Sequence, residues 1–201
     1  VCACWSTEER DRPRTNGPVP LSILEGEVDA GKSRVLARCA GYGGLEIVVH
    51  KLTGGEVVAF AENDPYAAKV FGHHHPGVPN LGDITEVEWG PALDTYRPEI
   101  ISAGFPCTDI SNAGHKEGIG GERSGIWKNV AQAVGIVRPR LVFLENVAAL
   151  RSRGLDTVAE DLAEIGYGVR WTCVRASDVG AAHRRDRWFG LARPATDTHQ
   201  F

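Results

Sequence analysis

The sequence has no methionine, no long apolar run and no excess of positive charge. No apolar stretch approaches the roughly 18 residues that a membrane-spanning helix needs. Residues 1–14 carry charges where a signal peptide has its apolar centre. We therefore expect a cytoplasmic protein with no membrane partner. Without a methionine, Val1 marks either a fragment or an unusual start.

The net charge of −4 excludes a compact basic module whose whole surface binds nucleic acid, so a DNA partner has to be held by a local basic cleft. Five cysteines at uneven positions, with no repeated C-x-x-C spacing, indicate neither a disulfide framework nor a structural zinc site. The histidines at 73–75 lie in a Pro/Gly loop and favour a surface cluster. We expect no metal site.

The chain has 201 residues, which suits one domain with a single core. Residues 1–33 are rich in charge, proline and glycine and are interpreted as a flexible leader or linker. The folded domain is expected over residues 34–193, with a short tail at 194–201. The oligomeric state is left open.

From Val35 onward, strand-like runs alternate with helical stretches, a pattern that is typical of a parallel sheet with crossover helices. The predicted strands are 35–39, 57–61, 100–104 and 141–145, and the predicted helices are 44–52, 65–72, 124–137 and 155–166. Two further strands, 167–174 and 188–192, have no helix between them and predict a closing antiparallel pair. Ligands of such α/β folds bind outside the carboxyl ends of the strands, where the strand order reverses.

Three of the loops at this edge suit a nucleoside-containing ligand. The glycine-rich loop 39–44 lets the backbone pass close to a ligand, although a tight strand-to-helix turn is an equal alternative. Glu62 follows about 20 residues later, where such folds hold a ribose diol. Asp64 is interpreted as the cap of the helix that starts after it. Asp83 and Ile84 offer an acceptor and an apolar face for an adenine, or a simple turn.

The remaining loops carry reactive side chains. Cys107, fixed by the preceding Pro106, is placed like a nucleophile after strand 100–104, and Glu145 reaches the same edge of the sheet. A hydrolase would pair the thiol with a histidine base, so this pair indicates other chemistry. Strand alternation sends Arg185 and Arg187 to one side, although the run alone favours a solvated charge cluster.

The series CAGYGG, AEND, GDI, GFPC-x-x-x-S, ENV and HRRDR resembles the DNA cytosine-5 methyltransferases over about residues 34–193. This resemblance implies an α/β, Rossmann-like methyltransferase sheet, mostly parallel with an antiparallel strand near the C-terminus and helices on both faces. It also implies S-adenosyl-L-methionine as methyl donor and double-stranded DNA as substrate, with transfer to C5 of a flipped-out cytosine through a covalent Cys107 adduct at C6.

Residue by residue, the resemblance assigns cofactor binding to Cys39, Ala40, Gly41, Tyr42, Gly43, Gly44, Glu62, Asn63, Asp83, Ile84 and Pro106. It assigns Cys107 as nucleophile, Glu145 as the acid that holds cytosine N3, and Arg185 and Arg187 as the arginines of a Gln-x-Arg-x-Arg motif. The chain departs from the family pattern at Ala37-Arg38-Cys39 (Asp-Leu-Phe in many members), at Thr108 and at His183, both of which replace glutamine.

Family members continue into a target-recognition domain and a last helix, whereas this chain stops at Phe201. We expect a missing or separate C-terminal recognition part, with permutation as the lesser alternative. A non-catalytic DNA-binding or regulatory relative is one rival function. The other is a P-loop nucleotide hydrolase, because residues 26–33 match G-x-x-x-x-G-K-S; that motif requires a helix directly after it, not a strand.

Overall fold

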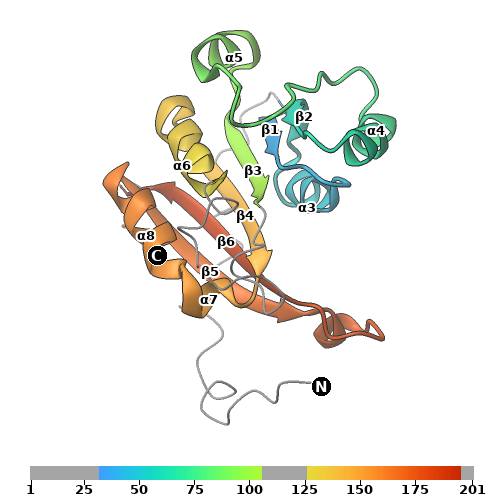
Figure 1. Cartoon of the computed structure of the whole chain (residues 1–201), viewed down its shortest axis with the longest axis vertical. Helices are drawn as coiled ribbons and strands as arrows, with labels where there is room; N and C mark the ends of the chain where they lie inside the picture. Colours follow the sequence, from blue (N-terminus) through green and yellow to red (C-terminus); the bar gives the residue numbers. More distant parts are fainter. Residues whose placement is uncertain (1–31, 106–125, 196–201) are drawn as a thin grey trace.

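A computed structural model describes residues 32–105 and 126–195 (Figure 1). The elements in chain order are β1 (Arg34–Arg38), α3 (Gly44–Thr53), β2 (Glu56–Ala61), α4 (Pro65–His74), α5 (Trp89–Tyr96), β3 (Ile100–Gly104), α6 (Ile126–Val137), β4 (Leu141–Val147), α7 (Leu150–Arg153), α8 (Leu155–Glu164), β5 (Tyr167–Arg175), η2 (Ala176–Val179) and β6 (Asp186–Pro194). Every strand and helix predicted from the alternation is present, with its ends moved by a few residues.

The strands form one mixed sheet in the order β2-β1-β3-β4-β6-β5. The first four strands are parallel, whereas β6 runs antiparallel to both β4 and β5. The chain proceeds from β1 to β2 on one side and then returns to place β3 on the other side of β1. The strand order therefore reverses between β1 and β3, where ligands of open α/β sheets bind. The predicted fold class is confirmed.

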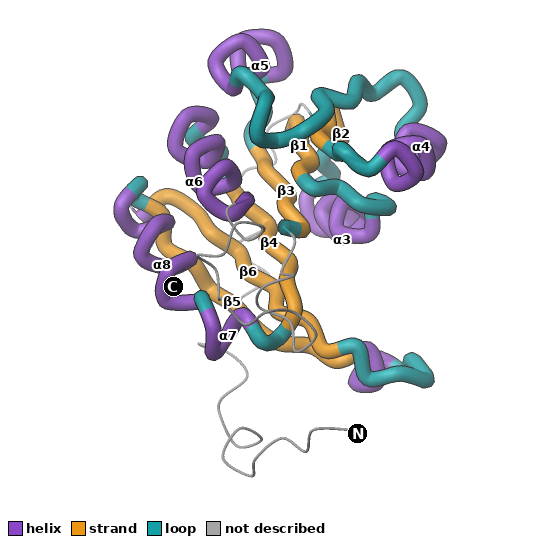
Figure 2. Tube along the Cα trace, viewed as in Figure 1, coloured by secondary structure: helices purple, strands orange, loops and turns teal. Residues whose placement is uncertain are grey.

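Helices cover both faces of the sheet (Figure 2). Alternate side chains of β1 point to opposite faces: Val35 packs in a cluster with Val49 of α3, and Leu36 in a larger core with Trp127 of α6. Helices α5, α6 and α8 share this larger core, whereas α3 and α4 lie on the other side. Helices thus bury both faces of the sheet, and the carboxyl ends of the parallel strands stay open to a ligand.

Three short elements were not predicted. Helix α5 has glycine and proline at its second and third positions, which look like turn signals but are tolerated in a first helical turn. Helix α7 and η2 have only four residues each, too few for a periodic pattern. Among the described residues, no helix is long and apolar enough to cross a membrane.

The P-loop alternative is not supported where the motif enters the described part of the chain. Residues 26–31 lie outside that part, but Lys32 and Ser33 are followed directly by β1, not by a helix. Lys32 also forms an ion pair with Glu56 at the start of β2. The lysine is therefore engaged at the amino end of the parallel strands, opposite to the edge where ligands bind.

Candidate functional site

A cavity of about 270 Å³ lies at the switch point between β1 and β3. Its walls come from the last residues of β2 and β3, from the loops after β1 and β2, from the Gly82–Ile84 turn and from the start of α6. The lining residues are Cys39, Gly41, Ala61, Glu62, Asn63, Gly82, Ile84, Gly104 and Ile126. The three loops predicted to hold a nucleoside-containing ligand therefore meet around one cavity.

Glu62 connects two of these loops through its carboxylate. Oε2 accepts a hydrogen bond from the backbone N–H of Gly41 at 2.8 Å, and Oε1 accepts one from the N–H of Asp64 at 3.0 Å. Gly41 adopts φ +51°, a left-handed conformation that glycine reaches without strain. The carboxylate thus fixes the glycine loop against the end of β2, and Glu62 lines the cavity.

Asp83 is also held by hydrogen bonds but is not one of the residues that line the cavity. Its carboxylate accepts from the N–H and Oγ1 of Thr85 at 2.8 and 2.7 Å, and from Nδ2 of Asn63 at 3.0 Å. These hydrogen bonds, those from Thr85 first, lower the pKa of Asp83. Asp83 therefore stays ionised. Its neighbours Asn63 and the buried Ile84 line the cavity.

The glycine loop divides into lining and supporting residues. Cys39 and Gly41 line the cavity, whereas Ala40 is buried in a cluster with Phe60 and Phe71, and Tyr42 is 70% exposed. Gly43 and Gly44 form the cap and first residue of α3. Burial raises the pKa of the Cys39 thiol to about 12, so this cysteine stays protonated and lines the cavity as an uncharged side chain. Asp64 caps α4, as predicted.

Glu145 lies at the end of β4, directly opposite Gly104 in the parallel register. A Cβ on Gly104 would stand 3.6 Å from Oε2 of Glu145, so the carboxyl group borders the cavity wall. Arg187 of β6 forms an ion pair with it, Nε to Oε1 at 2.7 Å. Burial raises the pKa of Glu145, and the nearby Arg187 and Arg185 oppose that rise. A carboxyl that retains its proton can donate a hydrogen bond.

Pro106 and Cys107 lie outside the described residues. The residue before them, Phe105, is buried, with its ring 5.1 Å from that of Trp127. Its carbonyl accepts a hydrogen bond from Nδ2 of Asn146, which is itself 1% exposed. The chain therefore leaves β3 from a point fixed against the strand that carries Glu145.

Arg185 does not belong to β6, which begins at Asp186. Its φ of +27° departs from extended backbone, so the alternation that paired Arg185 with Arg187 does not reach it. In the ranges 32–105 and 126–195, no three histidine, cysteine, aspartate or glutamate side chains gather as a metal site would require. His75 instead stacks on Phe71 at 4.5 Å.

Sequence reasoning overlooked several wall residues and one buried charge. Ala61 and Ile126 offered no chemical signal, and only their places in the fold bring them to the cavity. Arg38, beneath Cys39, is fully buried, donates to the carbonyls of Asn129 and Val130, and stacks 4.0 Å over the Trp89 ring. It ties the end of β1 to the N-terminal half of α6.

Comparison with known proteins gives consistent matches. The family model described as C-5 cytosine-specific DNA methylase matches residues 34–196. Type II methyltransferase M2.BsuMI of Bacillus subtilis (strain 168) is 34% identical over 79% of this chain and 41% of its own length. Type II methyltransferase M.CviJI of Paramecium bursaria Chlorella virus IL3A is 35% identical over 75% of this chain and 41% of its own length. The chain spans less than half of either relative.

Solved structures share the fold at lower identity. A DNMT2 mutant from Spodoptera frugiperda has a TM-score of 0.67 at 20% identity, covering 83% of this chain and 51% of the other. Dnmt2 methyltransferase of S. pombe has the same TM-score and identity, with coverage of 85% and 55%. These structures support the arrangement of strands and helices described above.

Proposed function

Because this chain belongs to the C-5 cytosine-specific DNA methylase family, we propose that it transfers a methyl group from S-adenosyl-L-methionine to C5 of a cytosine in double-stranded DNA. The observation that carries this proposal is the position of Glu145. A carboxyl group with a raised pKa, held by Arg187, stands across Gly104 from the switch-point cavity. This arrangement suits a flipped base beside Glu145 and a methyl donor in the cavity.

The cavity residues fit the proposed cofactor. Glu62 is an acceptor for the ribose hydroxyls, Asn63 presents an amide, and Ile84 offers an apolar surface for an adenine ring. Gly104 leaves open the space that a Cβ would fill, between the Cys39 carbonyl and Glu145. When bound, S-adenosylmethionine supplies an electrophilic methyl group on a sulfonium. Of the residues assigned to it by resemblance, those that line the cavity are the strongest candidates.

In the proposed reaction, Cys107 and Glu145 act on the base itself. The Cys107 thiolate forms a bond to C6, while Glu145 donates a hydrogen bond or proton to N3, so that electron density rises at C5. C5 then forms a bond to the methyl carbon as the bond from that carbon to the sulfonium sulfur breaks and leaves a neutral thioether. The C5 proton passes to solvent, the electrons of that C–H bond re-form the C5–C6 double bond, and the C6–sulfur bond breaks to release the thiolate. Flipping the base out of the duplex costs a few kcal/mol.

The surroundings of Glu145 suit the role of a donor. Burial favours the protonated carboxyl, whereas Arg187 and Arg185 limit how far the pKa rises. We propose that Arg187 also fixes the carboxyl in the orientation that N3 requires, through its 2.7 Å contact. Activity that depends on a protonated Glu145 should fall as the pH rises through its pKa.

We propose that the target sequence is recognised by a further part, covalent or separate, because the chain spans 41% of the length of its relatives. The described residues form the methyltransferase sheet and supply no second unit beside it. Sequence readout requires side chains in the major groove. Assays should therefore include the C-terminal part of a relative as well as the chain alone.

Covalent trapping on duplex DNA containing 5-fluorocytosine tests the proposal, since fluorine at C5 blocks the final elimination. With S-adenosylmethionine and a recognition part supplied, the wild type should form an adduct that survives denaturing electrophoresis. Cys107→Ala should form none, and Cys173→Ala, which removes a buried cysteine of β5, should form it normally. An adduct that persists in Cys107→Ala would overturn the assignment, and cofactor and DNA binding without any adduct would favour the non-catalytic relative.

A further inference from the structure

The antiparallel pair β5 and β6 extends beyond the sheet as a narrow arm (Figure 1). Strand β4 pairs with β6 only as far as Arg187, so no other strand of the described residues lies beside residues 175–186. This segment, which we name the arm, contains the end of β5, η2 and the turn that leads into β6. It starts next to the arginine that holds Glu145 and points away from the core.

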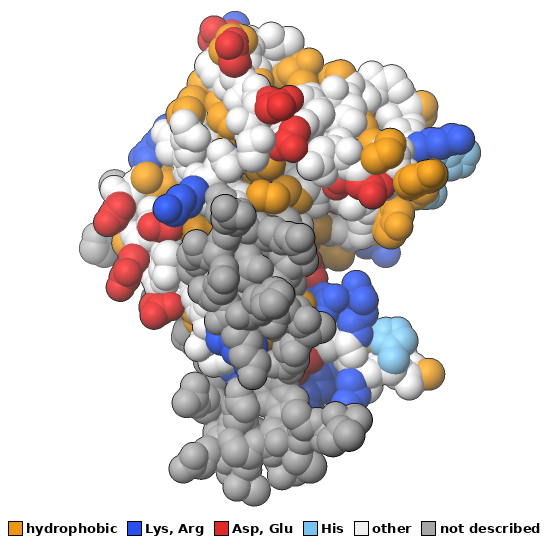
Figure 3. Space-filling model, in the orientation of Figure 1, with side chains coloured by type: hydrophobic (Ala, Val, Ile, Leu, Met, Phe, Trp, Pro, Cys, Tyr) orange, Lys and Arg blue, Asp and Glu red, His pale blue; other side chains and the backbone are white. Residues whose placement is uncertain are grey.

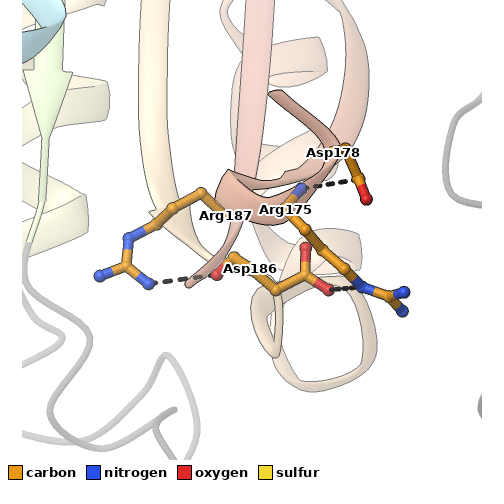
Figure 4. Close-up of polar contacts among 4 residues, drawn as sticks. All are labelled: Arg175, Asp178, Asp186 and Arg187. Carbon is orange, nitrogen blue, oxygen red and sulfur yellow. Dashed lines mark hydrogen bonds and ion pairs between the residues drawn. The ribbon is translucent and has the colours of Figure 1, made fainter. Parts of the chain in front are cut away.

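Hydrogen bonds within the arm give it a defined shape. The N–H of Ala176 donates to the carbonyl of Arg184 at 2.8 Å, and Ala181 donates to Ala176 at 3.0 Å. Asp186 accepts from Nε of Arg175 at 3.4 Å, and Asp178 accepts from the Arg175 backbone at 3.0 Å (Figure 4). Both acidic side chains of the arm are thus directed toward Arg175.

The positive charges of the arm and its base differ in their partners. Arg175 is paired with Asp186, and Arg187 with Glu145. For Arg184, no side-chain partner exists among the residues that the structure describes, and its side chain is exposed. Figure 3 shows basic side chains gathered over this arm, in contrast with the acidic ones above it. Arg184 is therefore available to an external anion, and the shape of the arm does not depend on its side chain.

We infer that the arm binds the sugar–phosphate backbone of the DNA, with Arg184 contacting a phosphate outside the flipped nucleotide; this inference rests on the proposed function. Arg187 follows Arg184 by three positions, so their Cα atoms lie at most about 11 Å apart. One strand of DNA rises about 3.4 Å per nucleotide, so the phosphate lies within about three steps of the target. A phosphate contact of this kind fixes the position of the duplex and reads no sequence.

A salt series of DNA binding tests the arm. The 201-residue chain is titrated against two fluorescent duplexes of unrelated sequence from 50 to 200 mM salt. Arg184→Gln should weaken binding about three- to tenfold on both duplexes and lower the slope of log K against log salt by about 0.9. Arg184→Lys should keep most of the slope. Lys51→Gln, which removes an exposed charge on α3, away from the arm in Figure 1, should match the wild type.

The possible outcomes separate this inference from the proposed function. An Arg184→Gln slope equal to that of Lys51→Gln overturns the arm contact and leaves the methyltransferase proposal standing. A loss confined to one of the two duplexes would show sequence readout and also overturn it. A wild type that binds cofactor but neither duplex overturns the arm contact, while the methyltransferase proposal is decided by the trapping experiment, in which a recognition part is supplied. Cofactor affinity, measured by calorimetry, should be the same in all four proteins.

Discussion

The cavity at the β1–β3 switch point and the antiparallel edge formed by β4, β6 and β5 meet at Gly104 and Glu145, yet they use charge differently. Around the cavity, the carboxylates of Glu62 and Asp83 are engaged by backbone and side-chain donors. Along the antiparallel edge, Arg187 is paired and Arg184 is exposed. A small ligand in the cavity thus binds to side chains that are already held in place. A polyanion on the antiparallel edge binds to positive charges that it neutralises itself.

Glu145 stands where the two regions meet, and its substitution should have the largest effect. Glu145→Gln keeps the size and an acceptor oxygen but has no carboxyl proton to give to N3, so methyl transfer should fall by about 10²–10⁴. Cofactor affinity should stay within twofold, because the cavity loops are unchanged. Single-turnover transfer of labelled methyl groups measures the rate of methyl transfer, and calorimetry measures the cofactor affinity. Glu160→Gln, on the exposed side of α8, is the control. Equal transfer rates would remove Glu145 from the mechanism.

The cavity side depends on glycine at one supporting position. Gly43 has φ +83°, and a Cβ there would lie 3.3 Å from the Phe71 ring. Gly43→Ala should lower the free energy of unfolding by about 2 kcal/mol through backbone strain and crowding. Gly44→Ala is a matched control, because Gly44 has no such φ and no neighbour within 4 Å of a new Cβ. Urea denaturation followed by circular dichroism compares them, and equal midpoints would contradict the predicted strain.

The Glu62 carboxylate is expected to shape the cavity through two simultaneous contacts. Glu62→Gln leaves one acceptor for the N–H groups of Gly41 and Asp64, and S-adenosylmethionine affinity should fall about tenfold through a less ordered loop and a weaker ribose contact. DNA affinity should not change, which separates this region from the arm. Glu56→Gln, at the opposite end of β2, provides the control in calorimetry. Unchanged cofactor affinity would mean that the ribose binds elsewhere.

The sequence was sufficient to predict which loops meet, because the carboxyl ends of parallel strands share one edge of a sheet. It could not predict that Glu62 would bond to the Gly41 N–H, since this contact depends on a left-handed backbone at Gly41. Ile126 reaches the cavity only because α6 returns over the sheet. Arg185 precedes β6 and has a positive φ, so strand alternation does not apply to it, yet Arg185 and Arg187 both act on the pKa of Glu145. The periodicity of the sequence specifies which residues lie on each face and at each edge of the sheet. Individual contacts between side chains and backbone depend on local turns of the chain.

Glu46 lies between α3 and the parallel strands of the sheet. Its substitution is expected to have the smallest effect of those considered, a change in the free energy of unfolding that depends on pH. It is 3% exposed on α3, and its Oε1 accepts a hydrogen bond from Ser102 of β3 at 2.6 Å. The other oxygen, Oε2, has no hydrogen-bond partner among the described residues. Burial raises the pKa of this carboxyl above its ordinary value.

The raised pKa fixes the sign of the effect on stability. In the unfolded chain this carboxyl releases its proton near pH 4.3, whereas the folded protein retains the proton to higher pH. The folded state therefore binds more protons in that window, and the stability contributed by Glu46 falls as the pH rises through it. Glu46→Gln keeps the acceptor for Ser102 but stays neutral, so its free energy of unfolding should rise relative to that of the wild type as the pH rises above the ordinary glutamate pKa. Urea unfolding at several pH values measures this difference, with Glu160→Gln as the exposed control. A difference that does not change with pH would mean that the Glu46 carboxylate is stabilised by groups other than Ser102.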